Sequence, residues 1–223
     1  MQVDAIIVAA GASERFGGQD KLLADLCGRP VVAWAIEAFQ RAPSIAGIVL
    51  VGRQGRLHDL DGLVRRWAPG KFRQVVAGGE RRRDSVEAGI LAATTEFVAI
   101  HDGARPLIDP AVIDACIEAA TLSGAATAAT GLVDTVKVVD GSVIVGHPAR
   151  ETLRAVQTPQ VVRRDDWLRA ASMSDADETD DTAMVARAGV QAVAVEGGWT
   201  NLKITRPLDL AIARMILESE GRC

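Results

Sequence analysis

Several features that mark common classes of protein are missing from this sequence of 223 residues. Its net charge is −4, and no block of basic residues interleaves with aromatic ones, which argues against nucleic acid as a main partner. The longest apolar runs fall far short of the ~20 residues that a membrane span needs. The first residues, MQVD, show no basic segment followed by an apolar one, so no secretory signal is expected. These absences predict a cytoplasmic protein without a membrane or nucleic-acid partner.

Cysteine and histidine are also scarce. Cys27, Cys116 and Cys223 are odd in number, widely spaced, and match no zinc or disulfide pattern. We therefore expect reduced thiols, as is usual in the cytoplasm. No Ser/His/Asp or Cys/His arrangement for nucleophilic catalysis is apparent, and the three histidines are interpreted as non-catalytic.

The composition, 48% hydrophobic and 24% charged, suits one globular domain with a sizeable core. Apolar runs alternate with amphipathic stretches, a rhythm that predicts an α/β fold with a mostly parallel sheet flanked by helices. Predicted strands lie at residues 3–9, 48–51, 74–77, 97–100, 125–130 and 192–195. Predicted helices begin near Pro30, Leu57, Ser85, Pro110, Asp166 and Pro207, with a further one ending near Ala188. No linker is visible, so residues 1–223 are expected to form a single domain.

The alternation breaks after residue 130. Residues 135–139 and 142–145 flank Asp140-Gly141, a dipeptide that strongly favours a two-residue hairpin turn. The sequence thus predicts a projecting β-hairpin arm at about residues 132–150. Such an arm could pack on a second subunit or fold back on its own domain, and the residues alone do not decide between these.

The first predicted strand, Val3–Ala9, ends at Ala10-Gly11, where ligands bind in open parallel sheets. Small residues there let backbone N–H groups approach a phosphate. Two cations, Arg15 and Lys21, follow within reach of an anion. An ordinary solvated loop with incidental basic residues is the alternative.

Neither common phosphate-binding motif fits this loop. The P-loop pattern fails because Lys21 comes three residues after Gly18 and is followed by Leu22. The dinucleotide pattern fails because Ser13 stands where its second glycine should be.

Four later segments also carry chemistry: GGERRRDSV at 78–86, HDGARP at 101–106, TPQ at 158–160 and NLKITRP at 201–207. The first combines open backbone with a helix start, and surface arginines on a capped helix are its plainer interpretation. Asp102, at the end of a strand, is placed to hold Mg²⁺ against a triphosphate, or else forms a turn. Pro159 predicts a rigid turn. Lys203 could face an anion or be a strand-edge charge.

Together and in this order, the five segments resemble the 2-C-methyl-D-erythritol 4-phosphate cytidylyltransferase family. The AAG…R…K loop is shared with many nucleotidyltransferases, whereas HDGARP, TPQ and NLKITRP are more specific. The resemblance runs from about residue 5 to 210. It implies a Rossmann-like nucleotidyltransferase domain that transfers CMP from CTP to methylerythritol phosphate and releases pyrophosphate, with Mg²⁺ as cofactor.

The resemblance also implies roles for the matching residues. The nucleotide site would comprise Ala9, Ala10, Gly11, Gly79, Glu80, Ser85 and Gly103. The substrate side would comprise Asp102, Arg105, Thr135, Arg150, Thr158, Thr179 and Lys203. Catalytic cations would be Arg15, Lys21, Arg150 and Lys203, and Asp102 would also be the metal ligand.

This chain departs from the family pattern at a few of these positions. Glu80 stands where a relative can have Asp, and Gly103 stands where many carry Ala. Ser13 and Glu14 replace a more glycine-rich loop, which leaves the backbone path there less certain.

In the family the hairpin arm crosses to a second subunit. The resemblance therefore implies a homodimer in which Thr135 and Arg150 serve the partner's site. Two alternatives stay open: a cytidylyltransferase for another polyol phosphate, such as ribitol 5-phosphate, and a non-catalytic nucleotide-binding protein.

Overall fold

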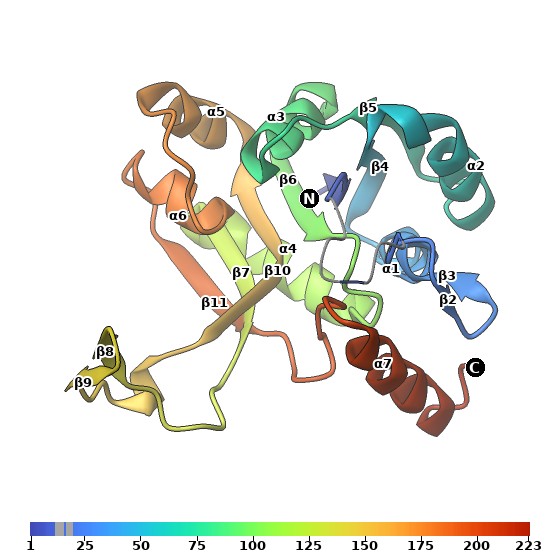
Figure 1. The fold of residues 1–223 in the computed structure, drawn as a ribbon. Helices are drawn as coiled ribbons and strands as arrows, with labels where there is room; N and C mark the ends of the chain where they lie inside the picture. The colour runs from blue at the N-terminus through green and yellow to red at the C-terminus, as the bar shows by residue number, and fades with distance from the viewer. Residues whose placement is uncertain (12–15, 17–19) are drawn as a thin grey trace.

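The structure is a computed structural model that describes residues 1–11, 16 and 20–223. Its centre is a seven-stranded sheet with strand order β11-β7-β10-β6-β1-β4-β5 (Figure 1). β10 runs antiparallel to its neighbours β6 and β7, and the other neighbouring strands are parallel. The strands of this sheet are β1 (Val3–Ala9), β4 (Ile45–Gly52), β5 (Phe72–Ala77), β6 (Phe97–Asp102), β7 (Ala125–Thr130), β10 (Ala155–Arg163) and β11 (Ala192–Glu196). The predicted α/β class is confirmed.

Helices cover both faces of this sheet (Figure 1). One apolar cluster joins a sheet face to α1 (Val31–Arg41), α2 (Leu57–Trp67) and α4 (Pro110–Ser123). A second cluster joins the other face to α3 (Arg82–Ala92), α5 (Arg164–Met173) and α6 (Asp181–Ala186). Local signals fix some of the boundaries: Asp109 caps the first turn of α4 through the Ala111 N–H, and Gly124 ends the helix in the left-handed region.

The middle of the sheet fixes where a ligand can bind. β1 is buried almost along its whole length, as its continuous apolar run predicts. Its register pairs Val8 with Asp102 at the end of β6. Because parallel strands end at the same edge, the segments that follow β1 and β6 start side by side.

The structure corrects the interpretation of residues 158–160. This TPQ segment lies inside β10 rather than in a turn between elements. A proline argues against a central strand because it cannot donate a ladder hydrogen bond. Here the register between β10 and β7 shifts between Val156 and Gln160, so Pro159 falls where the ladder is interrupted.

The predicted hairpin forms from β8 (Val138–Asp140) and β9 (Val143–Gly146), and the left-handed Gly141 makes its turn. It projects away from the main sheet, at the lower left of Figure 1. Its valines and Ile144 are more than half exposed. This arm thus presents apolar side chains that its own chain leaves uncovered.

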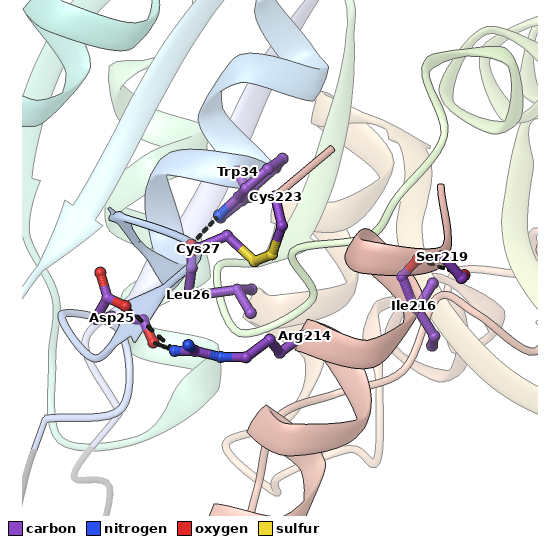
Figure 2. Close-up of a disulfide and its surroundings, with 8 residues drawn as sticks. All are labelled: Asp25, Leu26, Cys27, Trp34, Arg214, Ile216, Ser219 and Cys223. Carbon is purple, nitrogen blue, oxygen red and sulfur yellow. Dashed lines mark hydrogen bonds and ion pairs between the residues drawn. A yellow bond between two sulfur atoms is a disulfide. The ribbon is translucent and has the colours of Figure 1, made fainter. Parts of the chain in front are cut away.

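The prediction of reduced cysteines is wrong for two of the three. Cys27 and Cys223 form a disulfide, whereas Cys116 is a buried free thiol. The pairing was not readable from the sequence because 196 positions separate the two residues. They meet because α7 (Pro207–Ser219) packs beside a short hairpin of β2 (Asp25–Leu26) and β3 (Arg29–Pro30) (Figure 2). Arg214 strengthens this contact by bonding the backbone carbonyl and the carboxylate of Asp25.

We expect reduction of this disulfide to lower stability, because it frees a very long loop in the unfolded chain. A loss of about 2–4 kcal/mol in the free energy of unfolding is typical for a native disulfide. Urea unfolding with and without dithiothreitol measures it, and the double variant Cys27→Ser/Cys223→Ser is the control that should not respond. An unfolding free energy of the wild type that is unchanged by reductant would contradict the prediction.

Candidate active site

A cavity of about 240 Å³ opens at the carboxyl edge of the sheet, between the loop after β1 and the start of α3. Many of the predicted site residues line it, although they come from four distant stretches. From the predicted nucleotide site these are Ala10, Gly11, Gly79, Glu80 and Ser85, and they are joined by Lys21, Asp102 and Lys203, which were predicted for catalysis or for the substrate side. The structure thus brings two of the three described catalytic cations of the prediction, Lys21 and Lys203, to one cavity.

Glycine at position 78 lets the loop after β1 approach α3. A Cβ atom on Gly78 would lie 2.6 Å from Ser85 Oγ and 2.7 Å from Ala10 Cβ, closer than real contacts allow. The Ser85 hydroxyl bonds the Arg81 carbonyl, and the N-terminus of α3 is capped instead by Asp84, which accepts from the Arg81 N–H. Small residues therefore let the end of β1 and the start of α3 come together beside the cavity.

Asp102 lies at the centre of a group of cations. Its Oδ2 is 2.8 Å from Lys203 Nζ and 3.7 Å from Arg105 Nε, and its Oδ1 is 3.6 Å from Arg82 Nε. Burial alone would raise the pKa of Asp102, but Lys203 and Arg82 hold it well below its usual range. The carboxylate is therefore ionised at every pH at which the protein is expected to work.

Two neutral side chains fix the backbone of Asp102. Its N–H donates to Thr158 Oγ1 at 3.1 Å, and Thr158 Oγ1 lies 3.0 Å from His101 Nδ1. The other ring nitrogen of His101 faces the Arg105 carbonyl at 3.1 Å. A carbonyl only accepts, so that nitrogen carries the proton and Nδ1 accepts from the Thr158 hydroxyl. Burial lowers the pKa of His101 to about 4, which keeps the ring neutral and agrees with its non-catalytic interpretation.

A second cavity, of about 190 Å³, lies on the other side of Asp102. It is lined by four residues predicted for the substrate side besides Asp102: Arg105, Thr158, Thr179 and Lys203. Arg105 is anchored by its bond to the Asn201 carbonyl at 2.7 Å, and burial lowers its pKa. Asp102 and Lys203 line both cavities and therefore form part of the wall that the two share.

Two predicted residues lie beneath the site rather than in the walls of these cavities. Ala9 is buried at the end of β1, and Gly103 donates its N–H to the Val8 carbonyl at 2.9 Å. A Cβ atom on Gly103 would lie 3.2 Å from both Val32 Cγ2 and that carbonyl oxygen, so the fit is tight.

The remaining predicted residues are not brought to these cavities within one chain. Thr135 and Arg150 are exposed on the arm segment, where Arg150 bonds the Val133 carbonyl at 2.7 Å. Arg15 lies outside the described residues, so its role stays a prediction.

The donor set at Asp102 fits one mode of magnesium binding. Among the described residues, no three His, Cys, Asp or Glu side chains gather as a ready metal site. Mg²⁺ is commonly held by one or two carboxylates together with the phosphates of a substrate. Asp102, at the wall of the nucleotide-side cavity, supplies one such carboxylate.

Two residues at the site were missed from the sequence. Arg82 lines both cavities, and the buried Asp181 accepts its Nη2 hydrogen bond at 2.8 Å. Arg82 stands in a run of three arginines for which surface charge was the plainer interpretation, and Asp181 stands in the acidic stretch 175–181, a composition typical of a helix start. In the sequence they look like the charged residues beside them, and their role becomes visible only in the folded chain, where they contact each other.

Comparison with known proteins agrees with this architecture. A family model described as 2-C-methyl-D-erythritol 4-phosphate cytidylyltransferase matches residues 3–219. A protein of that name from Dehalococcoides mccartyi is 42% identical over 99% of this chain and 98% of its own, and one from Synechococcus sp. is 40% identical over 96% and 95%. Among solved structures, 4-diphosphocytidyl-2C-methyl-D-erythritol synthase from Anaerococcus prevotii superposes with a TM-score of 0.87 at 26% identity, covering 97% of this chain and 96% of that one. The chain therefore belongs to the 2-C-methyl-D-erythritol 4-phosphate cytidylyltransferase family.

Proposed function

We propose that the protein transfers CMP from CTP to 2-C-methyl-D-erythritol 4-phosphate, giving 4-diphosphocytidyl-2-C-methyl-D-erythritol and pyrophosphate. The observation that carries this is the pair of cavities that share Asp102 and Lys203 as a common wall. One cavity is lined by the small residues Ala10 and Gly11 together with Lys21, which suits a triphosphate, and the other by polar side chains, which suits a polyol phosphate. Family membership supplies the identity of the two substrates.

The reaction is an in-line displacement in which an oxygen of the 4-phosphate attacks the α-phosphorus of CTP. A phosphate monoester is already an anion near neutral pH, so no strong general base is required, and the neutral, buried His101 is consistent with this. The obstacle is the repulsion between two anionic substrates. Lys21 and Arg15 would stabilise charge at the reacting phosphate, while Lys203 would seat the attacking one.

Asp102 would hold Mg²⁺ together with oxygens of the triphosphate. The bound ion would neutralise phosphate charge. The chain's own part is to keep that carboxylate ionised and fixed, which the bond from its N–H to Thr158 and the cations around it support.

We further propose a homodimer formed through the arm. Its exposed apolar side chains are an unfavourable surface for a monomer, and partner burial would remove them from water. In that arrangement Thr135 and Arg150 of one subunit would complete the substrate cavity of the other.

We also propose a cytoplasmic location, where CTP is available as a substrate. Within the described residues, no helix of the length and apolar character of a membrane span is found.

The substrate assignment is tested by pyrophosphate release from CTP with methylerythritol phosphate, with ribitol 5-phosphate, and with no acceptor. We expect release with the first acceptor at a kcat/KM at least about 100-fold above that with the second, since a site built for particular hydroxyls strongly rejects the wrong ones. Faster release with ribitol 5-phosphate would reassign the acceptor. No release with any acceptor would favour a non-catalytic nucleotide-binding protein.

The dimer is tested by mixing two inactive variants. Lys21→Ala and Arg150→Ala are each expected to lose turnover by about 10²–10³-fold, by analogy with the loss of one charge-stabilising donor. If Arg150 serves the partner's site, a heterodimer has one intact site, and subunit exchange should restore about one quarter of wild-type activity. The size of the wild-type particle in solution should correspond to twice the 23.5 kDa chain.

Lys71→Ala is the matched control. Lys71 comes just before β5, at the amino ends of the parallel strands and thus away from the cavities, and it bonds the Ala42 carbonyl. It should keep normal turnover. A monomeric wild type, or mixtures that stay inactive after subunit exchange has been verified, would refute the crossed arm.

A further inference from the structure

Two carboxylates share the guanidinium of Arg82 at the start of α3. Its Nη2 donates to Asp181 Oδ2 at 2.8 Å, whereas its Nε lies 3.6 Å from Asp102 Oδ1, beyond an ordinary hydrogen bond. Burial lowers the pKa of Arg82, but the charges of Asp181 and Asp102 raise it on balance. The guanidinium is therefore a permanent cation that leans toward Asp181 and stops short of Asp102.

Asp181 is anchored from behind, independently of Arg82. Its side chain is 3% exposed, and its Oδ1 accepts from the indole N–H of Trp167 at 3.0 Å. Its backbone N–H donates to Gln160 Oε1 at 2.7 Å. Trp167 and Gln160 are themselves buried. These contacts hold the Asp181 carboxylate in place, and the carboxylate in turn positions the Arg82 guanidinium.

The position of Arg82 matters because of the geometry at Asp102. Lys203 Nζ lies 2.8 Å from Oδ2 of that carboxylate, and within the described part of the chain the ion pair to Oδ1 comes from the more distant Arg82 Nε at 3.6 Å. An arginine that is free to move closes on a carboxylate with two parallel hydrogen bonds. Such a pair would occupy Oδ1 as well and compete with a divalent cation for it.

We propose that Asp181 is a positioning residue that keeps Oδ1 of Asp102 open to the divalent cation accompanying the nucleotide, by holding Arg82 away from it. This rests on the proposed function, which places a metal–nucleotide complex in the cavity that Asp102 and Arg82 line. The same contact ties α3, on the nucleotide side, to α6, beside the acceptor cavity. Loss of the Asp181 charge should therefore weaken metal binding at a distance, although Asp181 never touches the metal.

The test measures binding of Mn²⁺ by electron paramagnetic resonance, in the presence of a CTP analogue whose α,β-bridging oxygen is replaced by methylene. Asp181→Asn should weaken Mn²⁺ binding by about 10-fold, in the range seen when a residue supporting a metal ligand is changed. Arg82→Met should bind Mn²⁺ at least as tightly as the wild type, because the competing cation is gone. The double variant should match Arg82→Met, since Asp181 acts only through Arg82.

A merely structural role for Asp181 would give another pattern: Asp181→Asn would weaken Mn²⁺ binding by the same factor whether or not Arg82 is present, and that result would overturn the proposal. So would unchanged affinity in Asp181→Asn. Arg83→Met is the matched control, because Arg83 neighbours Arg82 but donates to the carbonyls of Ala171 and Ser174. It is expected to lower the melting temperature without changing Mn²⁺ affinity.

CMP transfer by the wild type, measured alongside, separates this proposal from the proposed function. A wild type that transfers CMP while Asp181→Asn binds Mn²⁺ normally counts against Asp181 alone. A wild type that transfers no CMP counts against the function.

Discussion

The charge of Asp102 is the constraint on which the arrangement of the site depends. A carboxylate removed from water costs several kcal/mol unless cations and hydrogen bonds compensate it. Compensation comes from Arg82 at the start of α3, Arg105 just after β6, and Lys203 before α7. These segments are far apart in sequence, so the ion pairs of Asp102 hold the start of α3, the loop after β6 and the segment before α7 together. The fold places it there because β6 lies in the middle of the sheet, between β1 and β10.

The same arrangement explains how one carboxylate can serve a reaction between two anions. Without substrates, the cations Arg82, Arg105 and Lys203 outnumber the two carboxylates of Asp102 and Asp181. Phosphates that bind here can form ion pairs with these cations, which already lie in place before the substrates bind. Preorganised charge of this kind stabilises a transition state without reorganisation at the moment of reaction. The free-energy cost of holding these charges in place is met when the chain folds, by the buried hydrogen bonds of Thr158, His101 and Asp181.

Much of the fold could be predicted from periodicity, because strands buried on both faces read as continuous apolar runs, as Val3–Ala9 does. The hairpin followed from Asp140-Gly141 for a similarly local reason. β10 was missed because its proline sits at an interruption of the ladder that only the neighbouring strand reveals. The disulfide was missed because Cys27 and Cys223 are neighbours only after α7 docks. In the site, Lys203 and Asp102 lie within recognisable sequence motifs and could be predicted. Arg82 and Asp181 could not, because their role depends on a contact between residues distant in sequence.

Asp102 is expected to be needed for CMP transfer and not for nucleotide binding alone, and the variant Asp102→Asn separates these two roles. The measurement is single-turnover CMP transfer at saturating CTP, methylerythritol phosphate and Mg²⁺, with the melting temperature recorded to show that the fold persists. We expect a rate at least about 100-fold below that of the wild type, the scale of losing one charged group at a reacting phosphate. A folded Asp102→Asn protein that transfers CMP at nearly the wild-type rate would contradict it.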